Sequence, residues 1–460
     1  MRRSCTRPWL LQVAAFVAVF ASAGVGAGQG RSEPDTAPAP RRAPGPAAPT
    51  APTVAPAVLA GSVSIADAVR WALESNPEIV AQRSQRGIAA AGVVIARTYP
   101  FNPVWESSVR GTAGPSSAGV TNAVGVTERV GLDVEIHHQR RIREQGAAAT
   151  LSRTEWDIVS RELALAVRVE RAFDTVVYRF RKRQLIEFTI SLNARAAELV
   201  ADLVKAGRLN PVDEIVIRTE VQDARAQLTP GQASLVSAWQ DLYRALGLTE
   251  GEFTLQGGLD IPPPLEGDAE GLLRTALQRR PDLRSSQFAL DEADSRLRLE
   301  IANRLGNPNI GPAYEYNETR VSFIGVQFSL PLPVFNTHRG DIQQKQAERA
   351  QAALLLRQNE VFVRQDVRAA LARLEQARRW LATYRNDLVP SLEKSLKDII
   401  TLFEARAPGV DLLRVIDVQR KLLHARDLEL DAAFELRMAL ADLAAAVGDP
   451  SVALGPCPKE

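Results

Sequence analysis

Two helical stretches of nearly equal length, each preceded by a pair of short alternating segments, constrain this chain more than any other feature. They run over about residues 140–206 and 341–406. At 1.5 Å per residue each spans roughly 100 Å, whereas helices of globular proteins average about 12 residues. A strand pair that leads into so long a helix, twice in one chain, is hard to fold as a compact enzyme and favours a tube.

The chain also repeats itself with an offset of roughly 200 residues. The segment WALESNPE at 71–78 has a counterpart, TALQRRPD, at 275–282, and an Asn-Pro pair follows at 102–103 and at 307–308. Each long helix ends in a turn followed by an aspartate, and the two return helices end in the related sequences RALGL and AAVGD. Because these landmarks keep their order and spacing, they indicate an internal duplication.

The duplication and the local composition divide the chain into six parts. In order, these are a signal peptide (1–27), a Pro/Ala-rich disordered arm (28–61), a first structural repeat (62–258), a crossing linker (259–267), a second structural repeat (268–450) and a tail (451–460). The first repeat holds strands at about 103–110 and 120–132, the long helix 140–206 and a return helix 209–247; the second holds strands at about 310–317 and 321–330, the long helix 341–406 and a return helix 411–447. The shorter helical stretches 64–98 and 269–305 are expected to stack on the return helices.

The N-terminus has the pattern of a secretory signal. Arg2, Arg3 and Arg7 precede an apolar stretch from Trp9 to about Val25. The alternative is an uncleaved membrane anchor, since this stretch approaches spanning length.

Charge and cysteine content exclude other classes of protein. The chain has 56 Lys and Arg against 54 Asp and Glu, so no bulk charge points to nucleic acid. Cys5 lies in the leader and Cys457 near the end, which leaves the mature chain without an internal disulfide. Neither cysteine directly follows the apolar stretch, so no lipid-attachment site is expected.

The short segments before the long helices alternate with the period of a β-strand. Apolar Trp105 and Val109 alternate with polar Glu106 and Arg110, and similar patterns recur in the other three segments. A wall that is apolar outside and polar inside is typical of a barrel in lipid, which must close because an open edge cannot be satisfied there. Four strands are too few, so several chains would share one barrel. The alternative is a pair of soluble hairpins.

Two prolines interrupt the predicted helices. Pro390 predicts a kink in the second long helix, whose apolar seam includes Val363, Leu381 and Leu388. Pro230, followed by Gly231, predicts a more severe kink in the first return helix, or a split of that helix in two.

With these features, residues 62–450 resemble the outer-membrane factor family, the TolC-like tunnels of Gram-negative bacteria. The repeated AL-x3-P-[ED] starts, the Asn-Pro pairs and the turn AGRLNPVD at 206–213 carry the resemblance. The segment GVQFSLPLPVFNTHRGDI at 325–342 is similar to the branch that serves heavy-metal resistance pumps. The resemblance implies a mainly α fold with a β contribution: a homotrimer whose four strands per chain form one twelve-strand barrel above an α-barrel. It implies an outer-membrane location extending into the periplasm.

The resemblance also implies partners and site residues. The partners would be a periplasmic adaptor and an inner-membrane pump of the RND class, with outer-membrane lipid around the barrel. The family's acidic gate past the second turn matches Asp417, whereas Arg414 stands at its other position; Asp411 and Asp213 complete the candidate constriction. An alternative role for Asp213 and Asp411 is helix capping. Adaptor contacts are expected at the hairpin tips, namely Gly207, Arg208, Leu209, Asn210, Pro408 and Gly409.

No catalytic, cofactor or metal site is predicted. The four histidines, His137, His138, His338 and His424, have no ligand or triad spacing in the sequence. The sequence therefore predicts a passive exit duct of a tripartite efflux system, for heavy-metal cations. The alternatives are a duct for drugs or a secreted protein, and a periplasmic coiled-coil scaffold or adaptor.

Overall fold

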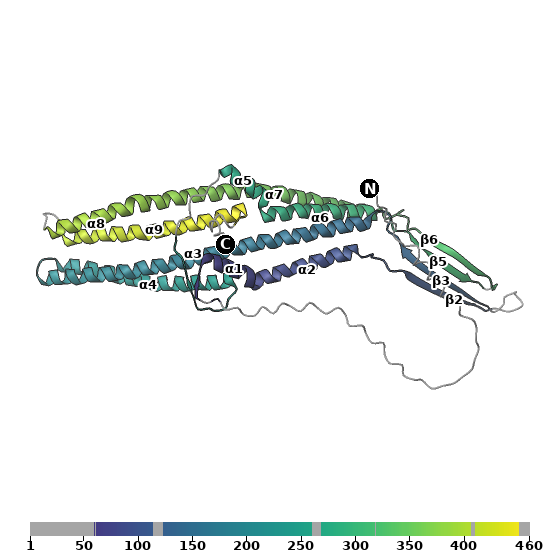
Figure 1. Ribbon diagram of the computed structural model, residues 1–460, viewed down its shortest axis with the longest axis horizontal. Helices are drawn as coiled ribbons and strands as arrows, with labels where there is room; N and C mark the ends of the chain where they lie inside the picture. The colour runs from purple at the N-terminus through teal and green to yellow at the C-terminus, as the bar shows by residue number, and fades with distance from the viewer. Residues whose placement is uncertain are drawn as a thin grey trace, which may run out of the picture. The chain divides into compact units, whose positions relative to one another are not determined.

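The computed structural model describes residues 59, 61–113, 123–259, 268–317, 319–405 and 410–449. They all belong to one compact unit, 56–460, while the other unit, 1–55, lies outside the described residues. The expected signal peptide, most of the arm, nearly all of the crossing linker and the C-terminal tail also lie outside them. Within the described part, long helices lead away from a four-stranded sheet and turn back at the opposite end (Figure 1).

The first repeat contains a short strand pair, two short helices, two longer strands and one helical hairpin. Its elements are β1 (Gly61–Val63), α1 (Ile65–Ser75), α2 (Pro77–Arg97), β2 (Val104–Thr112), β3 (Ala123–Asp133), α3 (Gln139–Lys205), α4 (Pro211–Leu246) and β4 (Phe253–Leu255). β1 and β4 pair in parallel. The sequence analysis missed both of them, because three-residue strands carry no measurable alternation.

The second repeat follows the same order. Its elements are α5 (Ala269–Arg279), α6 (Pro281–Asn303), β5 (Asn309–Tyr316), β6 (Ser322–Ser329), α7 (Arg339–Ala382), the π-helical turn η3 (Thr383–Leu388), α8 (Val389–Glu404) and α9 (Leu412–Val447). Each repeat has its own apolar core, one formed mainly by α1, α3 and α4 and the other by α5, α7 and α9. Helix α3 joins the repeats, since it also packs against α6 and α9.

The four longer strands form one antiparallel sheet in the order β2-β3-β5-β6. The register places Trp105 opposite Val130 and Ile310 opposite Phe328, so apolar side chains share one face. These side chains are exposed, with Ile324 at 86% and Val326 at 74%. The other face carries polar side chains, among them Glu106, Arg129, Glu315 and Gln327. The sheet thus exposes an apolar face and leaves β2 and β6 as open edges.

The helical stretch expected at 64–98 is broken in the structure. Asn76 has ψ 121° and ends α1, because the residue before a proline is disfavoured in the helical region. Its side chain then caps α2 through the N–H of Glu78, at 2.8 Å, while its amide donates to the carbonyl of Ala245 at the end of α4, also at 2.8 Å. The start of α2 therefore abuts the end of α4, as the sequence analysis expected for a stacked wall.

The second repeat has the same joint with different residues. Arg280 replaces the asparagine, and its guanidinium donates to the carbonyl of Ala446 near the end of α9, at 3.5 Å. In both repeats a glycine ends the return helix in the left-handed region, Gly247 with φ 74° and Gly448 with φ 80°. A Cβ at Gly247 would lie 2.8 Å from Cδ of Pro77, so close packing as well as φ requires glycine there.

The two prolines have different effects on their helices. Helix α4 runs from Pro211 to Leu246 through Pro230, so Pro230 does not split the helix. Both Pro230 and Ala226 are exposed, and water can satisfy the carbonyl that Pro230 leaves without a donor. Before Pro390 the helix instead widens into η3, where the N–H of Val389 reaches the carbonyl of Tyr384.

The π-turn also shifts the apolar seam. Val363 and Leu381, before the turn, are buried, but Leu388 is 42% exposed. Val389 is buried in its place and packs against α9. The extra residue of a π-turn moves the seam by one position, which a fixed heptad pattern does not predict.

Candidate gate and inter-repeat interface

The turn between α3 and α4 is closed by local capping. Gly207 has φ 69°, and its N–H donates to the carbonyl of Val204 at 2.9 Å. Asn210 caps α4 through the N–H of Val212, at 3.0 Å, and the carboxylate of Asp213 accepts from the N–H of Asn210 at 3.2 Å. Gly207, Arg208 and Asn210 are exposed, whereas Leu209 is half-buried. Asp213 therefore has a structural role in the capping box.

The turn between α8 and α9 is described only from residue 410 onward, so Pro408 and Gly409 lie outside the described residues. Asp411 is the N-cap of α9, and its carboxylate accepts from the N–H of Arg414 at 3.0 Å. Asp213 and Asp411 therefore both make helix-capping hydrogen bonds, which is the alternative role that the sequence analysis gave them.

A small apolar cluster brings the tips of the two hairpins together. Val200 of α3, Ile217 of α4 and Ile416 of α9 are buried against one another. Leu209 from the first turn and Leu412 from the start of α9 pack on this cluster. The candidate gate residues of both repeats therefore lie at one end of the structure, on the ends of the hairpins farthest from the sheet (Figure 1).

An exposed ionic network spans the hairpins near this cluster. Asp417 accepts from Arg420 at 2.9 Å and lies 2.8 Å from Nζ of Lys421. The hydrogen bond from Lys421 is the main cause that lowers the pKa of Asp417. Arg420 also donates to Glu220 of α4, at 3.2 Å. Within this network, Arg420 makes the ionic contact between the second and first hairpins.

A second charged cluster, farther from the tips, is buried. Glu170 and Asp174 of α3 are each 2% exposed and face Arg437 of α9. Arg437 donates to the carboxylate of Asp174 at 2.9 Å and lies 3.7 Å from Oε1 of Glu170. Burial is the main cause that raises the pKa of Glu170 to about 7, with a further contribution from the charge of Asp174. We call Glu170, Asp174 and Arg437 the buried triad.

Next to the triad, a polar layer continues between the same two helices. Nζ of Lys182 lies 2.8 Å from Asp431 and 3.3 Å from Asp427. Burial would lower the pKa of Lys182, but hydrogen bonds to Asp431 and Tyr178 outweigh it and raise the pKa. The ring of Tyr178 stacks on Phe434, with centroids 4.3 Å apart. The sequence analysis missed this layer because α3 and α9 are far apart in the chain.

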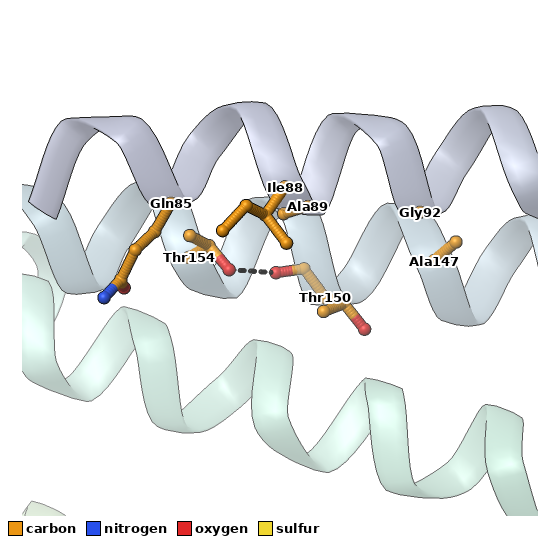
Figure 2. Close-up of a pocket in the computed structure, with 7 residues that line it drawn as sticks. All are labelled: Gln85, Ile88, Ala89, Gly92, Ala147, Thr150 and Thr154. Atoms are coloured by element: carbon orange, nitrogen blue, oxygen red, sulfur yellow. Dashed lines mark hydrogen bonds between the residues drawn. The ribbon is translucent and has the colours of Figure 1, made fainter. Parts of the chain in front are cut away.

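An open groove of about 490 Å³ lies between α2 and α3. Figure 2 shows its lining, in which Ile88 lies beside Thr150 and Thr154 and no side chain is titratable. The hydroxyl of Thr154 donates to the backbone carbonyl of Thr150 at 2.9 Å. The lining of this groove therefore has no side chain that would act as a general acid or base.

One histidine departs from the expectation that none has ligand spacing. His338 lies beside Glu300 of α6 and Asp341 of α7, with Nδ1 at 3.3 Å from a carboxylate oxygen of each. Glu300 is distant in sequence, and only the packing of α6 against α7 brings it to the histidine.

Among the described helices, none is both long and apolar enough to cross a membrane.

Comparison with known proteins agrees with this architecture. Residues 272–449 match the family model for outer membrane efflux proteins. The cobalt-zinc-cadmium resistance protein CzcC of Cupriavidus metallidurans is 26% identical over 373 residues, which cover 80% of this chain and 85% of that protein.

Solved structures show the same fold. A crystal structure of CusC aligns with a TM-score of 0.69 at 17% identity and covers 84% of this chain and 92% of the other. The outer-membrane channel MtrE of Neisseria gonorrhoeae aligns with a TM-score of 0.65 at 16% identity, covering 84% and 89%. Residues 272–449 are thus similar to the outer membrane efflux proteins, and the chain has the fold of the solved channel structures CusC and MtrE.

Proposed function

We propose that the protein is a passive outer-membrane exit duct of a tripartite efflux system and works as a homotrimer. The observation that carries the proposal is the four-stranded sheet, which has one exposed apolar face, one polar face and two open edges. In lipid, unpaired N–H and C=O groups at an edge cost several kcal/mol each, so a sheet of this kind must close on itself. Pairing β2 of one copy with β6 of the next closes it with twelve strands from three chains.

The two faces of the sheet support this arrangement. Apolar Ile324, Val326 and Phe328 would face lipid. Glu128 is the charged exception on that face, and it accepts from Nε1 of Trp105 at 2.6 Å and from the hydroxyl of Ser107 at 2.7 Å. The opposite, polar face would line a water-filled lumen, which is the pattern of an outer-membrane barrel.

A cysteine crosslinking experiment tests the shared barrel. Cys5 and Cys457 are replaced by serine, and one cysteine is placed on β2 and one on β6, in a series of registers that includes Ser107 with Val326. In the outer membrane, one register should give a covalent trimer under non-reducing conditions. Pairs on β3 and β5, which are already paired within one chain, are the control and should give only intramolecular bonds. Monomers at every β2–β6 register would contradict the shared barrel.

For the cargo we propose heavy-metal cations. The support is the similarity to the cobalt-zinc-cadmium resistance protein CzcC over most of both chains. A deletion strain should become sensitive to zinc, cobalt or cadmium salts and recover with the wild-type gene. Unchanged metal resistance together with new sensitivity to organic drugs would instead identify a drug duct.

We further propose that the hairpin tips are the gate and the docking end. Asp213, Asp411, Arg414 and Asp417 would line the constriction, with Asp417 held by Arg420 and Lys421. The exposed residues of the first tip, Gly207, Arg208 and Asn210, would contact a periplasmic adaptor, and through it an inner-membrane pump of the RND class. A photo-crosslinker at Arg208 should capture the adaptor in cells, and one at the sheet residue Phe328 should not.

A further inference from the structure

We propose that Glu300, His338 and Asp341 form a binding site for a divalent transition-metal cation of borderline softness, such as Zn²⁺ or Co²⁺. The three residues lie where the end of α6 meets the start of α7. One ligand atom of each falls within 4.8 Å of the other two. The site concerns binding by the chain itself and stands independently of the proposed transport function.

The histidine is placed by its backbone. His338 is the residue before α7 and has φ 54° and ψ 22°, a left-handed conformation that is uncommon for a residue with a Cβ. Its N–H donates to the side chain of Asn336 at 3.0 Å, and its carbonyl accepts from the N–H of Ile342 at 3.0 Å. These bonds hold the residue at the junction, and strain of this kind concentrates at functional sites.

The distances at the imidazole fit a metal better than a hydrogen bond. Nδ1 of His338 is buried and has no hydrogen-bond partner in the described structure, although it lies 3.3 Å from Oε1 of Glu300 and 3.3 Å from Oδ2 of Asp341. With metal–ligand bonds of about 2.1 Å, neighbouring ligand atoms lie about 3.0 Å apart in an octahedral site and about 3.4 Å apart in a tetrahedral one. The two observed separations fall within this range.

The ligand types indicate the class of cation. One imidazole nitrogen with two carboxylate oxygens suits Zn²⁺ or Co²⁺, and three protein ligands leave further positions for water. Soft Cu⁺ or Ag⁺ would require sulfur ligands, which are absent from this group. Asp341 is exposed and Glu300 and His338 are partly exposed, so a cation can enter from solvent and exchange.

The first repeat supplies a natural control. His138 has the same position before its long helix, α3, and the same left-handed conformation, with φ 60°. There Arg141 stands at the place that corresponds to Asp341, and its positive charge opposes a cation. The duplicated junction thus differs in the residues that would bind metal.

The test measures Zn²⁺ binding to the purified full-length protein in detergent, by competition with a chromogenic chelator, and Co²⁺ binding by its visible absorption. Wild-type protein should bind one ion per chain at this site, with a Co²⁺ spectrum that reports nitrogen and oxygen ligands. H338Q, E300Q and D341N should each weaken binding by about 100-fold or more, since loss of a ligand costs at least as much as loss of a supporting residue. H138Q should bind like the wild type.

Melting curves without metal separate loss of the site from loss of the fold. H338Q should melt like H138Q in the absence of metal, while added Zn²⁺ should raise the melting temperature of the wild type and of H138Q but not of H338Q. Wild-type binding in H338Q, or no binding by the wild type at micromolar Zn²⁺, would overturn the proposal. In the latter case Glu300 and Asp341 would be close neighbours of His338 without a role in metal binding.

Discussion

The first and second repeats meet through charged side chains at several places, and two of these contacts differ clearly in exposure. In the buried triad, Asp174 is 2% exposed and accepts from Arg437 at 2.9 Å. Near the tips, Arg420 donates to Glu220 at 3.2 Å, but its side chain is 63% exposed. Breaking a buried pair leaves an unsolvated charge, whereas water replaces the partner of an exposed one. The difference implies that charge holds the middle of the interface more strongly than the Arg420–Glu220 pair holds the tips, where the apolar cluster around Ile416 also packs.

Removing the arginine of the triad should have the largest effect. R437M leaves the buried carboxyl groups of Glu170 and Asp174 without the guanidinium that faces them, so the free energy of unfolding should fall by about 3–5 kcal/mol. Denaturant unfolding of the purified protein in detergent measures it. The triple variant E170Q/D174N/R437M removes all three charges and should recover most of the loss. A loss below about 1 kcal/mol in R437M would show that the triad is solvated, as an exposed pair is.

The triad should also make stability fall as the pH rises. The pKa of Glu170 is raised from 4.5 to about 7 in the folded protein. Between these values the folded state keeps a proton that the unfolded state releases, so the stabilising contribution is complete below about pH 4.5 and is lost as the pH passes 7. The total change is about 3 kcal/mol.

Unfolding curves at a series of pH values check this expectation. E170Q cannot titrate and should flatten the curve in this window. E220Q, at the exposed contact, should retain the slope of the wild type. If the free energy of unfolding of E170Q still falls with pH in this window, another group titrates there. Asp174 would be the first group to examine, because burial raises its pKa as well.

At the tips, the same kind of substitution should leave the fold nearly intact and change the gate. R420M should lower the free energy of unfolding by less than about 1 kcal/mol, and this loss should shrink further at high salt. If the contact with Glu220 holds the tips together, the ratio of open to closed channels should rise by up to about fivefold. Single-channel recording in planar bilayers measures this ratio. E220Q should act in the same direction, and unchanged opening in both would remove Arg420 from the gate.

The smallest effect on stability is expected at Asp411, where capping and gating can be separated. Asparagine caps a helix about as well as aspartate, so D411N should alter stability by only a few tenths of a kcal/mol. The substitution removes one negative charge per chain from the proposed constriction, and three per trimer should reduce cation selectivity in reversal-potential measurements. Unchanged selectivity in D411N would leave Asp411 with the capping role alone.

Local pattern in the sequence was sufficient for the long helices, the four longer strands and their order, but not for β1 and β4 or for the break between α1 and α2. The 3.6-residue and two-residue periods identify long helices and alternating strands because each side of an element meets one kind of environment. The duplication and the proline and glycine landmarks placed the turns, as at Gly207 and Asn210. The stacking of α2 on α4 followed from helix length alone, since each return helix is shorter than the long helix beside it.

Other features needed the tertiary structure. The local sequence did not indicate that α4 would continue through Pro230. It also did not indicate that a π-turn would form before Pro390. The sequence offered two roles for Asp213, gating and helix capping. The structure shows the capping contact, in which the carboxylate of Asp213 accepts from the N–H of Asn210.

The contacts between distant segments were beyond the sequence for a physical reason. Glu170 and Arg437, or Glu300 and His338, are ordinary charged residues on helices until packing removes water and sets their separation. Periodicity reports which side of a helix is covered but not which helix covers it. The sequence by itself determined a duplicated, strand-bearing helical tube, and the tertiary structure decided where its buried triad, its tip contact and its candidate cation site lie.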